Sequence, residues 1–200
     1  KGVLYAGIMI SGGRIKVLFM PDAMLALAWR LMHGASAKSV YEKVSPLAGK
    51  AGEKVFSPEL SVTDHPLDDS RPGARVFDDE GTASAKFRVV EKGVFQGFYN
   101  DLHYAKKLGE RPTGHGYRTA MWGGDPLELK PMPWLAHLRI EPGTKSLREL
   151  VAMMDRGIIL CDALGPHSGN IPNGDYSIGV APGLYVEKGE IKGSVKDAMI

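Results

Sequence analysis

Hydrophobic and polar residues alternate around short glycine-containing turns in several places, a pattern typical of β-hairpins. The clearest case is 86–99, with its turn at 91–93. A similar phrase recurs at 186–193, where the chain again reads V-E-K-G-x-apolar-x-G. The pattern at 8–19, with paired glycines at its centre, predicts a further hairpin, because glycine supplies the positive φ angles of tight turns. The sequence therefore predicts much antiparallel pairing.

Apolar residues at 24–32 wrap most of the circumference of a predicted helix, which should therefore be deeply buried. Asp22 is placed to cap its N-terminus. Gly34 should end or bend this helix before a second helical stretch that reaches about Lys43.

Two shorter helices carry clear boundary signals. Asn100 is placed to cap a helix that Gly109 ends. Ser146 and Glu149 form a capping box for another helix, for which Gly157 is the predicted stop.

Residues 44–85 and 109–133 are rich in proline and glycine and lack periodicity, apart from a short strand expected near 60–62. A long irregular segment inside a compact domain is often functional. The sum of these elements predicts an α+β fold, mainly an antiparallel and barrel-like sheet with a few helices packed on it.

Composition excludes several classes of function. The formal charge of +2 is spread evenly, without the clustered Lys/Arg stripe of a nucleic-acid reader. No apolar run approaches the roughly 20 residues that span a bilayer. The single cysteine, Cys161, excludes an intrachain disulfide framework and fits a reducing compartment. We therefore expect a cytoplasmic protein that binds neither nucleic acid nor membrane.

The histidines lack the spacing of a zinc site, because no two lie within one helical turn of each other. They are His33, His65, His103, His115, His137 and His167. Cys161 and His167 also match no common zinc pattern, and no Gly-x-Ser-x-Gly elbow marks a nucleophile. The sequence thus predicts no metal ligand and no catalytic residue in this chain.

The acidic run Asp78, Asp79, Glu80 and Gly81 is a first candidate for binding. Adjacent carboxylates can hold a cation or pair with the amine of a substrate. The alternative interpretation is a solvated turn in which aspartate side chains accept hydrogen bonds from local amides. The sequence leaves both interpretations open.

A second candidate is the loop with Thr113, Gly114, His115, Gly116 and Arg118. Its small residues allow close backbone approach to an extended peptide, and the arginine suits a carboxylate. The alternative is an ordered surface loop without a ligand. Together, these two segments are the candidate path for a peptide.

Both segments resemble the TldD/PmbA family of metalloproteases. The acidic run and the hairpin after it are similar to the family's Asp-Asp-Glu-Gly stretch, and 112–116 is similar to its Thr-Gly-Asn-Gly segment, where His115 replaces the commoner Asn. Residues 41–60 look more PmbA-like than TldD-like. The resemblance covers nearly the whole chain in order, through the segments 76–81, 89–97, 105–109, 112–116, 140–143, 174–180 and 183–189.

The resemblance implies a function. Members of the family are called modulators of DNA gyrase and are implicated in peptide maturation. TldD-type subunits carry His-Glu-x-x-x-His with zinc, and they pair with PmbA/TldE-type subunits that lack this motif. The equivalent helix here, 28–35, has one histidine and no glutamate. The resemblance therefore implies a PmbA/TldE-type subunit that binds no cofactor, with zinc in a TldD-type partner.

Residues 1–200 are then expected to be the C-terminal region of a longer protein whose N-terminal domain is absent from this sequence. The leading hypothesis is a subunit that forms walls of a peptide tunnel in a heterodimeric peptidase. The alternative is a non-proteolytic homodimer that captures peptides or a gyrase-related partner. The expected partners are accordingly a TldD-type subunit or a second copy, together with a peptide substrate.

Overall fold

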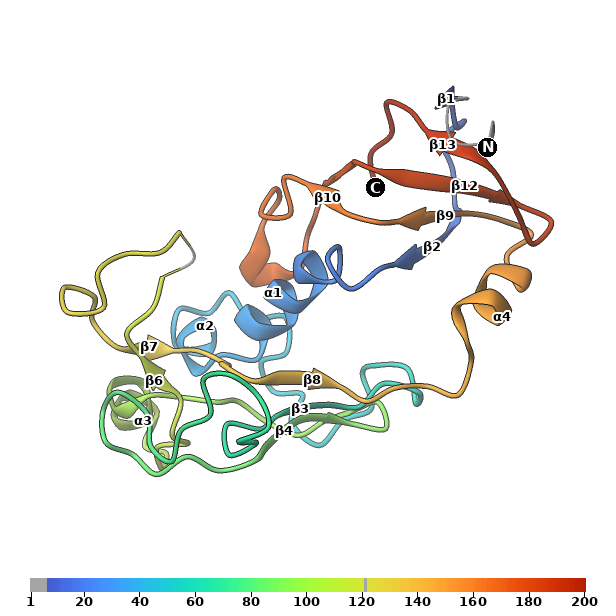
Figure 1. Ribbon diagram of the computed structural model, residues 1–200. Helices are drawn as coiled ribbons and strands as arrows, with labels where there is room; N and C mark the ends of the chain where they lie inside the picture. The colour runs from blue at the N-terminus through green and yellow to red at the C-terminus, as the bar shows by residue number, and fades with distance from the viewer. Residues whose placement is uncertain (1–6, 121) are drawn as a thin grey trace. The chain divides into compact units, whose positions relative to one another are not determined.

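The computed structural model describes residues 7–120 and 122–200. The chain divides into two compact units (Figure 1). Unit 1 contains the residues up to Leu31 together with Thr144–Ile200, and unit 2 is the continuous segment Met32–Gly143. Unit 1 is thus built from both ends of the chain, and each unit is described in turn.

A mixed β-sheet forms the centre of unit 1, with the strand order β1-β13-β12-β9-β2. The central strand β12 is antiparallel to β9 and β13, whereas β1 and β2 run parallel to their neighbours. Figure 1 shows β2, β9 and β12 side by side. The strands are β1 (Gly7–Ile8), β2 (Lys16–Phe19), β9 (Arg156–Leu160), β12 (Gly183–Glu187) and β13 (Glu190–Val195).

The hairpin predicted over 8–19 is wrong. β1 pairs with β13, where Gly7 lies opposite Ser194, and β2 pairs with β9, where Val17 lies opposite Ile158. The two strands therefore lie at opposite edges of the sheet. Local alternation identified strand-forming sequence, but it carries no information about a partner that lies far along the chain.

The two faces of this sheet carry separate apolar clusters, because successive side chains of a strand point to opposite sides. Ile158 and Leu160 pack with Ala26 of helix α1 (Leu25–Gly34) and with Ala23 just before this helix. On the other face, Ile159 packs with neighbours that include Met154 and Val186. A smaller antiparallel pair, β10 (Ala163–Leu164) with β11 (Gly179–Val180), and the 3-10 helix η2 (Ile171–Asn173) complete unit 1.

Helix α4 (Leu147–Ala152) has the predicted capping box, in which the Ser146 amide donates to Glu149 at 2.7 Å and the Glu149 amide donates to Ser146 Oγ at 3.3 Å. The predicted stop at Gly157 is wrong, because that residue lies inside β9. A side chain there would come within 2.8 Å of the Lys16 carbonyl oxygen. The glycine permits close strand approach rather than ending a helix.

Unit 2 contains an antiparallel sheet with the order β5-β4-β3-β8 and a separate pair of strands, β6 and β7. The hairpin predicted over 86–99 is confirmed as β4-β5. Lys92 and Gly93 both have positive φ angles, 47° and 83°, as type I′ turns require. The strands are β3 (Val62–Asp64), β4 (Phe87–Glu91), β5 (Val94–Phe95), β6 (Gly116–Tyr117), β7 (Met132–Pro133) and β8 (Leu138–Ile140).

The helices of unit 2 are α2 (Ala37–Tyr41) and α3 (Leu102–Leu108). Gly109 ends α3 in the left-handed conformation, as predicted. The predicted cap is wrong by one residue, since Asp101 Oδ1 accepts from the Tyr104 amide at 2.7 Å. Asn100 is fully buried and bonds across to Thr113 instead.

The α+β prediction is confirmed by these helices and mixed sheets. The sheets remain open, and none of them closes into a barrel within the described residues. Over the same two ranges, no helix combines the length and the apolar character needed to cross a membrane. The apolar core of unit 2 is contributed mainly by the sheet and by Tyr99, with Val62, Val89, Val90 and Phe95 fully or almost fully buried.

Candidate functional site

The two candidate segments of the sequence lie against each other in unit 2. We call 78–81 the acidic turn and 113–118 the histidine loop. The Gly116 amide donates to Asp78 Oδ2 at 2.9 Å, and its carbonyl accepts from the Asp79 amide at 3.0 Å. The Arg118 amide donates to Asp79 Oδ2 at 2.7 Å. The sequence separates these segments by more than thirty residues, and the fold joins them.

Asp78 organises the turn rather than facing a ligand. Its side chain is buried, and Oδ1 accepts from the amides of Glu80 at 3.0 Å and Thr82 at 2.8 Å. With the Gly116 amide, three backbone donors surround one carboxylate. The acidic run therefore forms a turn in which an aspartate side chain accepts hydrogen bonds from backbone amides, one of the two interpretations that the sequence left open. The carboxylate of Asp78 is buried, however, and not solvated as that interpretation expected.

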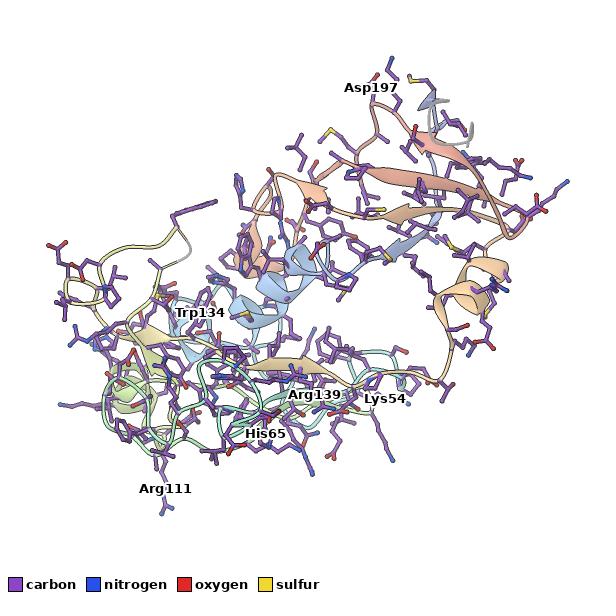
Figure 2. All side chains as sticks on the ribbon, in the orientation of Figure 1. Lys54, His65, Arg111, Trp134, Arg139 and Asp197 are labelled. Carbon is purple, nitrogen blue, oxygen red and sulfur yellow. The ribbon has the colours of Figure 1, made fainter. Side chains whose placement is uncertain are left out.

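The charged groups at the rim of this junction also have protein partners. Asp79 forms an ion pair with Arg75 at 3.1 Å. The Arg118 guanidinium donates to the Leu129 carbonyl at 2.8 Å. Figure 2 shows that the Arg111 side chain, just before the histidine loop, extends away from the ribbon of unit 2.

Glycine permits the close approach of turn and loop. A Cβ at Gly116 would overlap the Glu80 carboxylate, and one at Gly114 would lie 2.5 Å from the Ala83 carbonyl oxygen. Gly114 also has a φ of 75°, where L-residues are strained. Gly81, with a φ of 80°, closes the acidic turn on its exposed side.

The other end of the histidine loop is fixed to the segment before α3. The Thr113 amide donates to Asn100 Oδ1 and the Asn100 amide donates to Thr113 Oγ1, both at 2.8 Å. His115 is completely buried, with Nδ1 2.9 Å from Thr113 Oγ1 and Nε2 3.5 Å from Asp64 Oδ2. His115 therefore supports the loop from inside.

Glu80 is the member of the predicted set that lines a pocket, of about 540 Å³, in unit 2. Glu80 Oε2 accepts from the Leu102 amide at 2.8 Å. The pocket carries charges of both signs, which suits a dipolar ligand such as a peptide end. Its other lining residues are Lys38, Asp101, His103, Tyr104, Lys130, Pro131 and Met132.

Glu80 is also electrostatically perturbed. Burial raises the pKa of its carboxyl above the ordinary value, the Leu102 amide opposes this rise, and the neighbouring charges of Asp101 and Asp78 add to it. A cation bound beside Glu80 would relieve this repulsion. The pocket thus favours a ligand with a positive group next to Glu80.

The sequence did not indicate most of this lining. Lys38 comes from α2, His103 from α3 and Lys130 from the segment before β7. Residues so far apart come together only through tertiary packing, and no local spacing reports it. Asp101 alone had a local signal, as a residue suited to cap α3.

A larger pocket of about 700 Å³ lies in unit 1, between α4 and one face of the sheet. Its lining is mostly apolar, as with Met20, Val151 and Leu184, and includes the half-buried Cys161. No residue of the acidic turn or the histidine loop contributes to it. The charged pocket at Glu80 is therefore the stronger candidate for recognition.

The residues present do not fit a zinc site. In the part of the chain that the structure describes, no three His, Cys, Asp or Glu side chains are grouped so that they could hold a metal ion. A zinc centre needs three or four such ligands held together. We therefore assign no metal-dependent step to these residues.

The fold and the site describe an α+β domain with a charged pocket of about 540 Å³ at Glu80. Residues 12–200 match the family model described as the PmbA/TldA metallopeptidase C-terminal domain. The chain belongs to the PmbA/TldD family.

Solved structures agree with this assignment. TldE from Thermococcus kodakarensis is 31% identical, with a TM-score of 0.82 over 96% of this chain and 42% of that one. A protein of Thermotoga maritima described as a candidate modulator of a DNA gyrase is 35% identical, with a TM-score of 0.80 over 97% of this chain and 42% of that one.

Curated relatives include proteins named as PmbA homologues and proteins named as TldD homologues. The metalloprotease PmbA homologue of Haemophilus influenzae is 29% identical over 96% of this chain and 39% of its own length. The TldD homologue of the same organism is 28% identical over 84% of this chain and 33% of its own length. The chain thus spans about two fifths or less of these relatives, and identity alone does not separate the two types.

Proposed function

We propose that this chain is the C-terminal region of a PmbA/TldE-type subunit that binds peptides for a zinc-containing TldD-type partner in the cytoplasm. The observation that carries the proposal is the pocket that Glu80 lines together with two lysines and a histidine. The sequence supports it further, since no histidine of these 200 residues is followed by glutamate. The name of the Thermococcus relative, TldE, also supports it.

In this proposal Glu80 pairs with an ammonium group of the peptide. Lys38 and Lys130, which line the same pocket, supply the positive charge for a carboxylate or for peptide carbonyls. The junction of the acidic turn and the histidine loop keeps Glu80 in place while a ligand binds. The role of this chain is therefore to bind and orient the peptide, and bond cleavage belongs to the partner.

Peptide binding tests the role of Glu80. We expect fluorescein-labelled peptides with a free N-terminus to bind the full-length protein, and Glu80→Gln to weaken binding about fivefold, equal to ~1 kcal/mol for a partly exposed charge pair. Glu59→Gln is the matched control, because Glu59 is exposed in unit 2 and does not line this pocket. Equal affinity of Glu80→Gln and wild type would refute the assignment.

Hydrolysis assays separate the two functional hypotheses. We expect the full-length protein to cleave no peptide alone and to do so with a His-Glu-x-x-x-His partner. Cleavage by the isolated protein would contradict the proposal. Peptide binding without partner-dependent cleavage would favour the homodimeric binding protein instead. Elemental analysis completes the test, since about one zinc per chain would require ligands that lie elsewhere in the protein.

A further inference from the structure

We infer that Asp64 and His115 form a buried carboxylate–imidazolium pair that fixes the histidine loop beneath the acidic turn. Both side chains are completely buried, and His115 Nε2 lies 3.5 Å from Asp64 Oδ2. The hydrogen-bond partners of His115 determine which ring nitrogens carry protons. The link of the pair to Glu80 rests on the proposed function.

The hydrogen bonds of Thr113 determine whether His115 Nδ1 carries a proton. Thr113 Oγ1 accepts from the Asn100 amide at 2.8 Å and lies 3.0 Å from the Asn100 carbonyl oxygen. A carbonyl oxygen only accepts, so this contact uses the single hydroxyl proton of Thr113. The hydroxyl then has only a lone pair for His115 Nδ1, at 2.9 Å. His115 must therefore donate from Nδ1.

The carboxylate of Asp64 determines whether His115 Nε2 carries a proton. Neither Nε2 nor Asp64 Oδ2 has a hydrogen-bond partner among the described residues, although both atoms are buried. Asp64 Oδ1 accepts from the His137 amide at 2.6 Å, so one carboxylate oxygen already has a donor. An unprotonated Nε2 would direct its lone pair at the carboxylate of Asp64, and the two would repel each other. A second ring proton turns the repulsion into attraction, and the ring is then an imidazolium.

The surroundings suit a paired charge. The His115 ring lies 5.2 Å from Phe87 and 5.6 Å from Tyr99, between centroids, within the range of cation–π attraction. An unpaired charge among these aromatic rings would be very unfavourable, whereas a buried charge with its counterion beside it is tolerated more easily. Each member of the pair therefore requires the other.

The pair acts on the site through the backbone that follows His115. The Gly116 amide donates to Asp78, and the Gly116 Cα lies against the Glu80 carboxylate. A shift of the ring would move Gly116 and with it the turn that presents Glu80. His115 and Asp64 are thus positioning residues, without contact to a ligand.

Nitrogen NMR tests the charge directly in the wild-type protein. In full-length protein labelled with ¹⁵N-histidine near neutral pH, we expect both ring nitrogens of His115 to resonate as protonated nitrogens. His115→Gln identifies the signal by removing it, and His103→Gln on exposed α3 is the control that should leave it unchanged. Asp64→Asn should abolish the doubly protonated pattern. A neutral His115 ring in the wild type would overturn the inference.

Peptide binding tests the positioning role separately. His115→Gln keeps a polar donor beside Asp64 but loses the charge, and it should weaken binding of labelled peptide less than His115→Phe, which leaves Asp64 Oδ2 without a donor. Folding of each variant is checked by thermal unfolding. A folded His115→Phe with wild-type affinity would overturn the positioning role. If the wild type itself binds no peptide, the proposed function fails while the NMR result still decides the ion pair.

Discussion

Gly116 is the residue at which the acidic turn and the histidine loop come closest. A methyl group there would overlap the Glu80 carboxylate. We expect Gly116→Ala to lower the free energy of unfolding by about 1–3 kcal/mol, because Glu80 must leave the Leu102 amide to make room. Urea denaturation measures this. Gly143→Ala is the control, since that glycine has open space around it and no strained φ, and equal losses for both variants would contradict the contact.

Glu80 also predicts a pH dependence. Burial and the charge of Asp101 raise its pKa, and an ammonium ligand needs the ionised form. Peptide affinity should therefore fall as the pH drops through this raised pKa, at a higher pH than for an ordinary glutamate. Asp101→Asn, which can still cap α3, should move the midpoint down. Dissociation constants across pH measure this, and a midpoint unchanged by Asp101→Asn would contradict the electrostatic account.

Single residues mark the limit of prediction from sequence. The sequence identified the acidic turn and the histidine loop, because glycines and acids in such density are rare outside turns. It assigned the cap of α3 to Asn100, although Asp101 holds that role. Both residue types cap helices equally well, and only the pairing of Asn100 with Thr113 decides between them. The sequence correctly predicted a capping side chain at the start of α3, but which of the two residues caps the helix depends on the fold.

Among the elements, those defined by adjacent residues were predicted and those defined by distant partners were not. The hairpin β4-β5 has its turn, register and strands within one short segment. The hairpin at 8–19 was wrong because β1 and β2 find their partners near the other end of the chain. The β6-β7 pair was missed because the strands are short and their connection carries no periodicity.

Helix α4 offers a test at the scale of one element. Hydrogen bonds from the Ser146 hydroxyl and amide lower the pKa of Glu149. A lowered pKa means that the capping contribution is present above the ordinary glutamate value and is lost as the pH falls through the folded value. The Ser146 amide shift, followed by NMR, should titrate below the ordinary range. Ser146→Ala should raise the Glu149 midpoint, and an unchanged midpoint would contradict the capping box.

At the scale of the whole molecule, the two units differ in how the chain builds them. Unit 2 is continuous, and its buried residues, among them Val90, Phe95 and Tyr99, all come from Met32–Gly143. Unit 1 needs β1, β2 and the start of α1 from one end of the chain and the remaining strands from the other. A core that lies within one continuous segment can fold without the rest of the chain.

We therefore expect a fragment of residues 32–143 to fold alone and a fragment of residues 144–200 to remain unfolded. The second fragment lacks β2, the edge partner of β9, and it lacks Ala23 and Ala26, which pack against Ile158 and Leu160. Dispersion of amide signals in NMR spectra distinguishes the two states. In the folded fragment, slow amide exchange at Gly116 would show that Asp78 still holds the histidine loop. Narrow dispersion for 32–143 would mean that the core of unit 2 is insufficient without unit 1.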